Sequence, residues 1–185
     1  WLYNVPMASI LPRKTLILAS RSPRRALLLR EAGFAFSRFA PPFADPADPN
    51  ELFESPQTQR DGRVVAQRLA ELKAQSVPAD ALPADAVLLT ADTIGITPDG
   101  RLVGTPETAD QARAMLEQLV GHTHTIATGV ALTSHGQEPR SFFDAAAVNV
   151  GQISATQLDH YVNSDQWVGK AGGYNLAERL DAGWP

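Results

Sequence analysis

Apolar positions along this chain recur with two different periods, which predicts a protein built from both strands and helices. Continuous apolar runs of strand length occur at Thr15 to Ala19 and at Ala86 to Ala91, and the second is typical of a strand covered on both faces. The pattern predicts strands at 15–19, 34–39, 86–91 with an extension through 96, 102–103, 123–133 and 141–150. It predicts helices at 22–32, 61–77 and 108–121, and a fourth that opens at 154. This mixture indicates an α/β or α+β fold.

Capping residues and helix breakers set the boundaries of these elements. Ser22 and Pro23 offer an N-cap and a first-turn proline, and Ser154 with Gln157 forms a capping box. The four residues 134–137 form a turn, so we expect the strands on either side to pair as a hairpin. Residues 40–60 carry five prolines and several acids, which predicts a loop or mobile connection. A glycine-rich loop is expected at 169–174.

Length and composition predict one soluble domain with two lobes. The 185 residues are 44% apolar, no run approaches the length of a membrane span, and no signal-peptide pattern opens the chain. The absence of cysteine excludes disulfides and thiolate zinc sites, and cytoplasm is the default location. A net charge of −4 gives no general attraction for nucleic acid, so we expect a small partner held by a local basic cluster, and no membrane or nucleic-acid polymer.

The first strand leads directly into a predicted anion-binding corner. The free N–H groups and dipole of the first helix lie beside Ser20, Ser22, Arg24 and Arg25, whose hydroxyl and guanidinium groups suit phosphate oxygens. Consecutive helical residues point about 100° apart, so the two arginines cannot both reach one ligand atom, and one can brace its surroundings instead. An ordinary N-cap flanked by two solvated arginines remains the alternative interpretation.

Asp92 follows an apolar strand, where open α/β sheets present ligand-contacting residues at the carboxyl ends of their strands. A carboxylate there can hold Mg²⁺ or accept a proton from an attacking water, or it can simply open the next turn. Lys73 lies at the edge of the apolar stripe of its helix and can either reach inward or cover the core with its methylenes. Lys170, among glycines, is either a ligand-binding cation or part of a surface loop.

The histidines and the absence of two nucleotide-binding motifs argue against several common kinds of site. His122 and His124 alternate as metal ligands would, but no third ligand accompanies them, so we expect exposed or edge-strand side chains. The sequence contains neither a P-loop nor a dinucleotide-binding glycine motif, which disfavours the standard ATPase and dinucleotide-binding folds.

These residues resemble the Maf-type (septum formation protein) nucleoside triphosphate pyrophosphatases. Leu18 through Leu29 matches the family's L-A-S-x-S-P-R-R motif and the leucine-rich helix after it, and Ala91-Asp92-Thr93 matches its A-D-T. Later matches follow in the same order at Met115 to Gly121, His124, Thr128 to Ala131, Tyr161-Val162 and Lys170 to Tyr174. The resemblance covers residues 15–178.

The resemblance implies an α/β fold with a mixed twisted sheet flanked by helices, similar to inosine triphosphatase, elongated and with a central cleft. It implies hydrolysis between the α- and β-phosphates of a nucleoside triphosphate with a divalent cation, Mg²⁺ or Mn²⁺. Asp92 would be the catalytic carboxylate and a metal ligand, with Asp45 as a second metal ligand. The substrate-binding residues would be Ser20, Ser22, Arg24, Arg25, Lys73, Thr93 and Lys170. Thr93 resembles the branch of the family that acts on dTTP and UTP, and a homodimer is implied.

Departures from the family's pattern leave the substrate open. Thr105 replaces a lysine, Gly169 an aspartate, and Ala177 the glutamine of the dTTP/UTP branch, although Asn175 or Glu178 could substitute for that glutamine. We also expect residues 1–185 to be a single domain that lacks the family's C-terminal strand and helix, with residues 1–6 extraneous if Met7 is the start. A nucleotide-binding regulator of cell division with weak or lost catalysis is therefore the alternative function.

Overall fold

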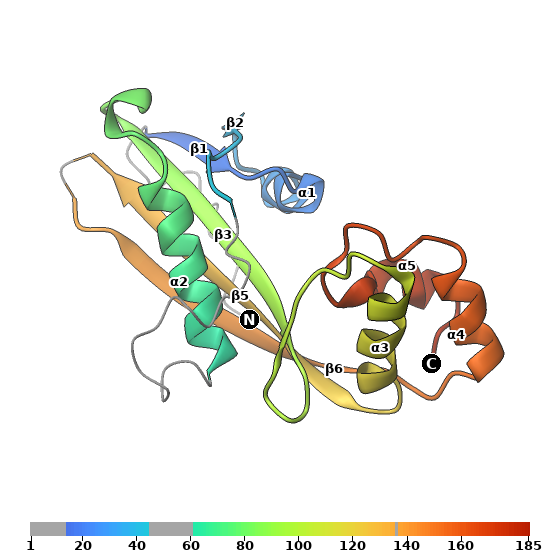
Figure 1. Ribbon diagram of the computed structural model, residues 1–185. Helices are drawn as coiled ribbons and strands as arrows, with labels where there is room; N and C mark the ends of the chain where they lie inside the picture. Colours follow the sequence, from blue (N-terminus) through green and yellow to red (C-terminus); the bar gives the residue numbers. More distant parts are fainter. Residues whose placement is uncertain (1–13, 45–60, 136) are drawn as a thin grey trace, which may run out of the picture. The chain divides into compact units, whose positions relative to one another are not determined.

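A mixed six-stranded sheet organises the residues that the computed structural model describes, which are 14–44, 61–135 and 137–185. The strands are β1(Thr15–Ala19), β2(Phe36–Phe39), β3(Ala86–Ile96), β4(Leu102–Val103), β5(Thr123–Ser134) and β6(Arg140–Asn149). The helices are α1(Pro23–Glu31), α2(Gly62–Gln75), α3(Ala109–Leu119), α4(Ala155–Val162) and α5(Leu176–Asp181), with 3₁₀ turns η3(Ala79–Ala81) and η4(Ala171–Gly173). The strand order is β2-β1-β3-β5-β6, and β4 pairs with β3 (Figure 1).

The sheet is parallel where β1 meets its two neighbours. Strand β1 pairs in parallel with β2, and it pairs in parallel with β3 from Thr15 opposite Ala86 to Leu18 opposite Leu89. Helix α1 is the crossover that returns the chain from β1 to β2, as parallel pairing requires. Strand β4 pairs antiparallel with the end of β3 through the turn that Pro98-Asp99-Gly100 predicted. The prediction of a mixed α/β fold is confirmed.

The contacts divide the chain into two compact units. Unit 1 holds the described residues of 14–44, 66–92 and 129–143, and unit 2 holds those of 61–65, 93–128 and 144–185. Strand β3 passes from unit 1 to unit 2 between Asp92 and Thr93, and β5 returns between Thr128 and Gly129.

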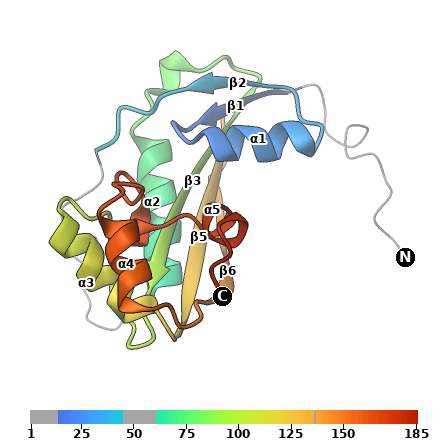
Figure 2. The ribbon, with the colours of Figure 1, turned by 90° about the vertical axis from the view of Figure 1, so that its right-hand side faces the viewer.

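Small residues dominate the core of unit 1, so helix α2 lies close to the sheet (Figures 1 and 2). The core consists of Ile17, Ala19, Ala70, Ala74, Val77, Ala86, Leu88 and Ala131. At Gly129 of β5, an added Cβ would lie 2.2 Å from the backbone carbonyl oxygen of Ala66. The buried Thr90 hydroxyl of β3 also donates to the Ala70 carbonyl at 2.7 Å. The backbone of α2 therefore touches both central strands of this unit.

Two buried aromatic side chains, Tyr161 and Trp167, pack with aliphatic residues in the core of unit 2. Leu116 and Leu158 pack with Tyr161 and Trp167, which are all buried between α3, α4 and the segment that follows α4. The polar ends of the rings are bonded to the backbone, because the Tyr161 hydroxyl donates to the Gly173 carbonyl at 2.9 Å and the Trp167 indole N–H to the Val162 carbonyl at 2.8 Å. Buried aromatic groups with a polar end normally find such a partner.

Most predicted elements are present with ends shifted by a few residues. The caps predicted at Ser22 and Ser154 are confirmed, and the capping box of Ser154 is complete. Thr108, where the third helix is expected to begin, caps α3. Helix α5 is missing from the sequence prediction, although Asn175 caps it. Most of the predicted loop 40–60 lies outside the described residues. No helix in the described part of the chain is long and apolar enough to cross a membrane.

Candidate functional site

The corner between β1 and α1 is built from hydroxyl groups that hold the backbone. Ser20 is buried, and its hydroxyl accepts the Ser22 N–H at 3.1 Å. Ser22 is the N-cap of α1, and its own hydroxyl accepts the Arg25 N–H at 3.4 Å. The predicted helix cap and the predicted anion corner therefore coincide, because the same N–H groups that need a cap are those that a phosphate would use.

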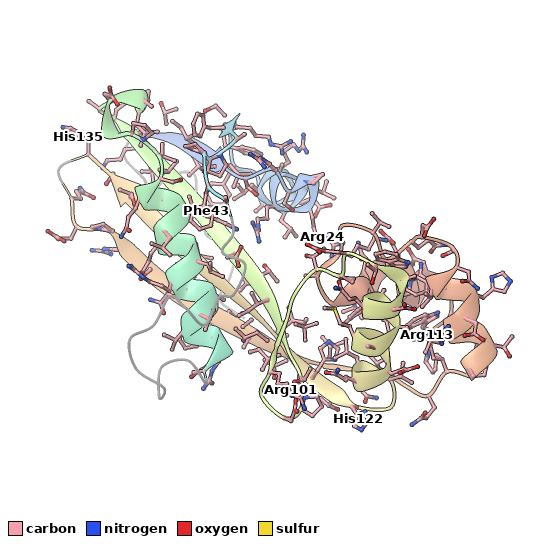
Figure 3. The ribbon with its side chains drawn as sticks, in the orientation of Figure 1. Arg24, Phe43, Arg101, Arg113, His122 and His135 are labelled. Carbon is pink, nitrogen blue, oxygen red and sulfur yellow. The ribbon has the colours of Figure 1, made fainter. Side chains whose placement is uncertain are left out.

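Arg24 and Arg25 have different surroundings. The Arg25 guanidinium is half-buried and donates through Nη1 to the Ala91 carbonyl at 2.7 Å and to the Ser20 hydroxyl at 3.4 Å. Arg24 is exposed on the first turn of α1 (Figure 3). The expectation that one arginine braces its surroundings is met by Arg25, which links α1 to β3. Arg24 is the one with its side chain in solvent.

Asp92 lies inside β3, because the predicted apolar strand at 86–91 and its extension through 96 form one continuous strand. It is the seventh residue of an unbroken strand of 11 and is 9% exposed. The pairing between β1 and β3 stops at Leu18 and Leu89, so β1 no longer flanks β3 at Asp92. Asp92 therefore does lie just beyond the carboxyl end of its parallel neighbour, the position at which α/β sheets present ligand-contacting residues.

Lys73 reaches inward from the last turn of α2 and forms an ion pair with Asp92. The side chains are only 13% and 12% exposed, so water screens their charges much less than it screens a surface pair. The Lys73 ammonium also lies 5.5 Å from the centre of the Phe43 ring, which Figure 3 labels beside α2. Of the two interpretations of Lys73, the structure therefore supports the one that points inward.

Thr93 and Lys170 belong to unit 2. The Thr93 hydroxyl shares a hydrogen bond of 3.0 Å with the Thr128 hydroxyl of β5. Lys170 directly precedes η4 and forms an ion pair with Glu178 of α5, whose other carboxylate oxygen accepts from the Asn175 side chain at 3.1 Å. The structure therefore brings Ser20, Ser22, Arg25, Lys73 and Asp92 together in unit 1, and it pairs Lys170 with an acid inside unit 2.

A divalent cation would find one carboxylate in the described part of this site. Asp45, the second predicted metal ligand, lies outside the described residues. No cluster of three or more His, Cys, Asp or Glu among the described residues is arranged to hold a metal. Mg²⁺ needs only one or two carboxylates when phosphate oxygens and waters complete its shell, so Asp92 fits a cation that arrives with a triphosphate.

The sequence did not reveal three contributors to these surroundings. Arg38 of β2 donates to the Ser20 and Arg21 carbonyls, both at 3.2 Å, and so fixes the backbone that enters α1. Phe43 is the second, as a partner of Lys73. Glu178 is the third in its pairing with Lys170, since the sequence offered it only in place of the missing glutamine. None of these contacts has a local sequence signal, because each joins residues that are distant in the chain or lie in different elements.

The expectation that both histidines are exposed or lie at a sheet edge is wrong for His124. His122 is exposed, but His124 on β5 is 2% exposed and its Nε2 shares a hydrogen bond of 2.7 Å with the Tyr174 hydroxyl. Its Nδ1 has no hydrogen-bond partner among the described residues. Burial lowers the pKa of His124, and it raises the pKa of Tyr174 to about 12. His124 is therefore part of the core of unit 2.

A family model described as Maf-like protein matches residues 15–182, which is most of the chain. The chain belongs to the Maf-like protein family. The match begins at β1 and ends at the residue after α5, so it includes the anion corner, Asp92 and Lys170.

Curated relatives in this family carry one activity in their names. A dTTP/UTP pyrophosphatase of Shouchella clausii is 36% identical over 162 residues, which cover 88% of this chain and 78% of the relative. A dTTP/UTP pyrophosphatase of Chlorobium phaeovibrioides is 35% identical over 169 residues, which cover 90% and 82%. Among solved structures, the Ham1 protein of Staphylococcus aureus matches with a TM-score of 0.47 and 13% identity over 74% of this chain and 72% of that one.

Proposed function

We propose that this Maf-like protein is a nucleoside triphosphate pyrophosphatase that hydrolyses the α–β phosphoanhydride of a nucleotide to a monophosphate and pyrophosphate. The observation that carries the proposal is the ion pair of Asp92 with Lys73 in unit 1, beside the capped start of α1. Its side chains are nearly buried, and a charged pair is costly to bury in a fold that does not use it. Relatives at 35–36% identity are named as enzymes of this class.

Each group in unit 1 has a chemical role in this reaction. The N–H groups at the start of α1 and the exposed Arg24 supply donors and positive charge for phosphate oxygens. Arg25 keeps α1 against the Ala91 carbonyl, which fixes the distance from that corner to Asp92. The Asp92 carboxylate orients a water and accepts its proton as the water oxygen bonds to phosphorus and the bond to the pyrophosphate leaving group breaks.

A divalent cation, Mg²⁺ or Mn²⁺, would be held by Asp92 and the substrate's phosphate oxygens, and it would neutralise charge that develops on those oxygens. Lys73 keeps the Asp92 side chain in one orientation whether or not the cation is bound, because its ammonium is itself held over the Phe43 ring. The second metal ligand, Asp45, and the substrate contacts of Thr93 and Lys170 stay predictions.

We propose a pyrimidine nucleotide as the substrate class, since the named relatives act on dTTP and UTP. Ala177 is on the first turn of α5 without a polar side chain, while Asn175 caps α5 and bonds Glu178. A role of Asn175 and Glu178 in place of the missing glutamine stays a prediction, as do the homodimer and the cytoplasmic location. The names of the relatives do not favour the alternative of a regulator without catalysis.

The test is release of pyrophosphate from a panel of nucleoside triphosphates in the presence of Mg²⁺ or Mn²⁺. We expect turnover of at least one pyrimidine nucleotide, and we expect Asp92→Asn to lower kcat by about a hundredfold or more, because it removes the proton acceptor and its charge. The matched control is Asp85→Asn, an exposed acid directly before the same strand. Absence of turnover with every nucleotide, or equal turnover in Asp92→Asn, would refute the proposal.

A further inference from the structure

Arg179 of α5 is a buried cation in unit 2. It is 8% exposed, and its guanidinium carbon lies 4.4 Å from the centre of the Tyr161 ring and 5.4 Å from that of Trp184. The two rings meet edge to face at 5.1 Å. Aromatic faces attract a guanidinium, so the rings provide part of the free energy that water provided before folding.

No carboxylate neutralises Arg179 in the described part of the chain. Its hydrogen-bond partner is neutral, since Nη2 donates to the side-chain oxygen of Gln166 at 2.6 Å. The neighbouring acid on α5, Glu178, is paired with Lys170. A buried arginine normally has an anionic partner, because a guanidinium loses its hydration on burial and aromatic faces cannot replace hydrogen bonds.

One edge of the guanidinium has an unused donor. The Nε–H of Arg179 is buried and has no hydrogen-bond partner among the described residues. Nε–H and one Nη2–H point the same way and form the side of the fork that binds two oxygens of one anion. Gln166 occupies only the Nη2 half of that edge, and because Gln166 is exposed its side chain can rotate away.

Arg179 also lines a pocket of about 330 Å³. The wall contains the Thr156 and Ser164 hydroxyls, the His160 ring and the Trp184 ring. The Thr156 hydroxyl and the His160 ring supply further donors to an anion that reaches the guanidinium edge, whereas the Ser164 hydroxyl already donates to the Tyr161 carbonyl at 2.7 Å. The pocket, the residues that line it and the unused donor all belong to unit 2, whereas Asp92 belongs to unit 1.

We propose that this pocket is a binding site for a small oxyanion, a carboxylate or a phosphate, which takes the Nε and Nη2 edge of Arg179 after Gln166 turns away. All residues of this site belong to unit 2, and the proposal does not depend on the chemistry at Asp92. An anion with two oxygens on one side accepts a hydrogen bond from the Arg179 Nε–H and also neutralises the guanidinium charge. A water or a neutral group cannot do both.

The Arg179 Nε–H resonance reports on the site directly in a ¹⁵N NMR titration of the purified protein. Acetate and inorganic phosphate are the probes, each added at constant ionic strength so that screening does not change. We expect a saturable shift of this resonance with at least one of the two anions. The anion that saturates the shift at the lower concentration shows whether the site prefers a carboxylate or a phosphate. Absence of a saturable shift with both anions, up to roughly 10 mM, would overturn the proposal.

Two substitutions of Gln166 test the proposed edge without removing the arginine from the core. Gln166→Glu supplies an internal carboxylate in the place of the ligand, so we expect it to weaken external anion binding about tenfold or more. Gln166→Ala removes the competing acceptor, and its half-saturating concentration should equal or fall below that of the wild type.

The matched control is Asn163→Asp, which adds the same charge at an exposed position after α4. We expect it to change the half-saturating concentration by less than about threefold, because exposed charges interact weakly through water. Equal weakening by Asn163→Asp and Gln166→Glu, or no weakening by Gln166→Glu, would show that Arg179 does not bind the anion through this edge.

Discussion

The two units of this protein differ in the size of their core side chains. They also differ in the surroundings of their charged side chains. Unit 1 packs alanines between α2 and the sheet, so the helix backbone touches β3 and β5, and the charges of Lys73 and Asp92 meet out of water. Unit 2 packs tyrosine and tryptophan rings whose polar ends are hydrogen-bonded. Its ion pair, Lys170–Glu178, is partly exposed, and its buried cation, Arg179, lies against the rings. Close backbone approach therefore accompanies the nearly buried ion pair of unit 1, whereas large rings form much of the core of unit 2.

The largest effect is expected from a side chain placed between α2 and β5 in unit 1. In Gly129→Ala the new Cβ would lie 2.2 Å from the Ala66 backbone, so α2 has to move away from the sheet. We expect a loss of at least about 3 kcal/mol in the free energy of unfolding, because backbone cannot yield as a flexible side chain can. Denaturation with urea measures it.

The matched control is Gly104→Ala in unit 2, where a Cβ meets nothing within 4 Å. That change should stay within about 0.5 kcal/mol. Similar losses in the two variants would mean that close backbone approach does not distinguish the units.

The next largest effect is expected from removal of the Lys73 ammonium group from its ion pair with Asp92. Lys73→Met should lower kcat for pyrophosphate release by about 10²–10³, as the loss of one preorganised polar contact does at other active sites. Arg68→Met, on the same helix with a more exposed partner in Glu71, is the control and should retain nearly full activity.

The stability of the same variants tests whether the pair acts as a unit. Lys73→Met leaves the Asp92 carboxylate without its cation, so adding Asp92→Asn to Lys73→Met should recover part of the lost free energy of unfolding. If the two changes are simply additive, the ion pair contributes nothing to folding.

The buried histidine makes unit 2 sensitive to acid. Because burial holds the pKa of His124 below its unfolded value of 6.5, the unfolded chain takes up the proton first as the pH falls. Stability from this group is present above pH 6.5 and is lost as the pH falls from there toward the lowered pKa. Urea denaturation at several pH values between 7.5 and 5 should show a smaller decline in His124→Gln than in the wild type. An unchanged decline would assign the acid sensitivity to other groups.

The smallest effect is expected at the ion pair of unit 2. Glu178→Gln should change the free energy of unfolding by less than about 1 kcal/mol, because Glu178 is 46% exposed and its charge is screened by water. If Lys170 binds phosphate as predicted, freeing it from Glu178 should lower KM with little change in kcat. A rise in KM would instead mean that Glu178 contacts the substrate or keeps Lys170 in its binding position.

The sequence by itself determined most of the elements and their caps, and it predicts an anion-binding corner at Ser20 to Arg25. Periodicity and caps such as Ser22 and Ser154 act over a few residues, so they are readable without knowledge of the fold. The motifs at Leu18 to Leu29 and at Ala91 to Thr93 likewise indicate the family without knowledge of the fold. Helix α5 went unpredicted because six residues are too few to show a period.

Tertiary structure alone decided which of these groups meet. Whether Lys73 points inward, and whether Arg24 or Arg25 braces β3, depends on how close α1 and α2 lie to the sheet. The burial of His124 and the orphaned donor of Arg179 likewise arise from side chains distant in sequence, Tyr174 for one and Tyr161 for the other. Such contacts have no local signal, because each depends on the packing of elements that the chain brings together only when it folds.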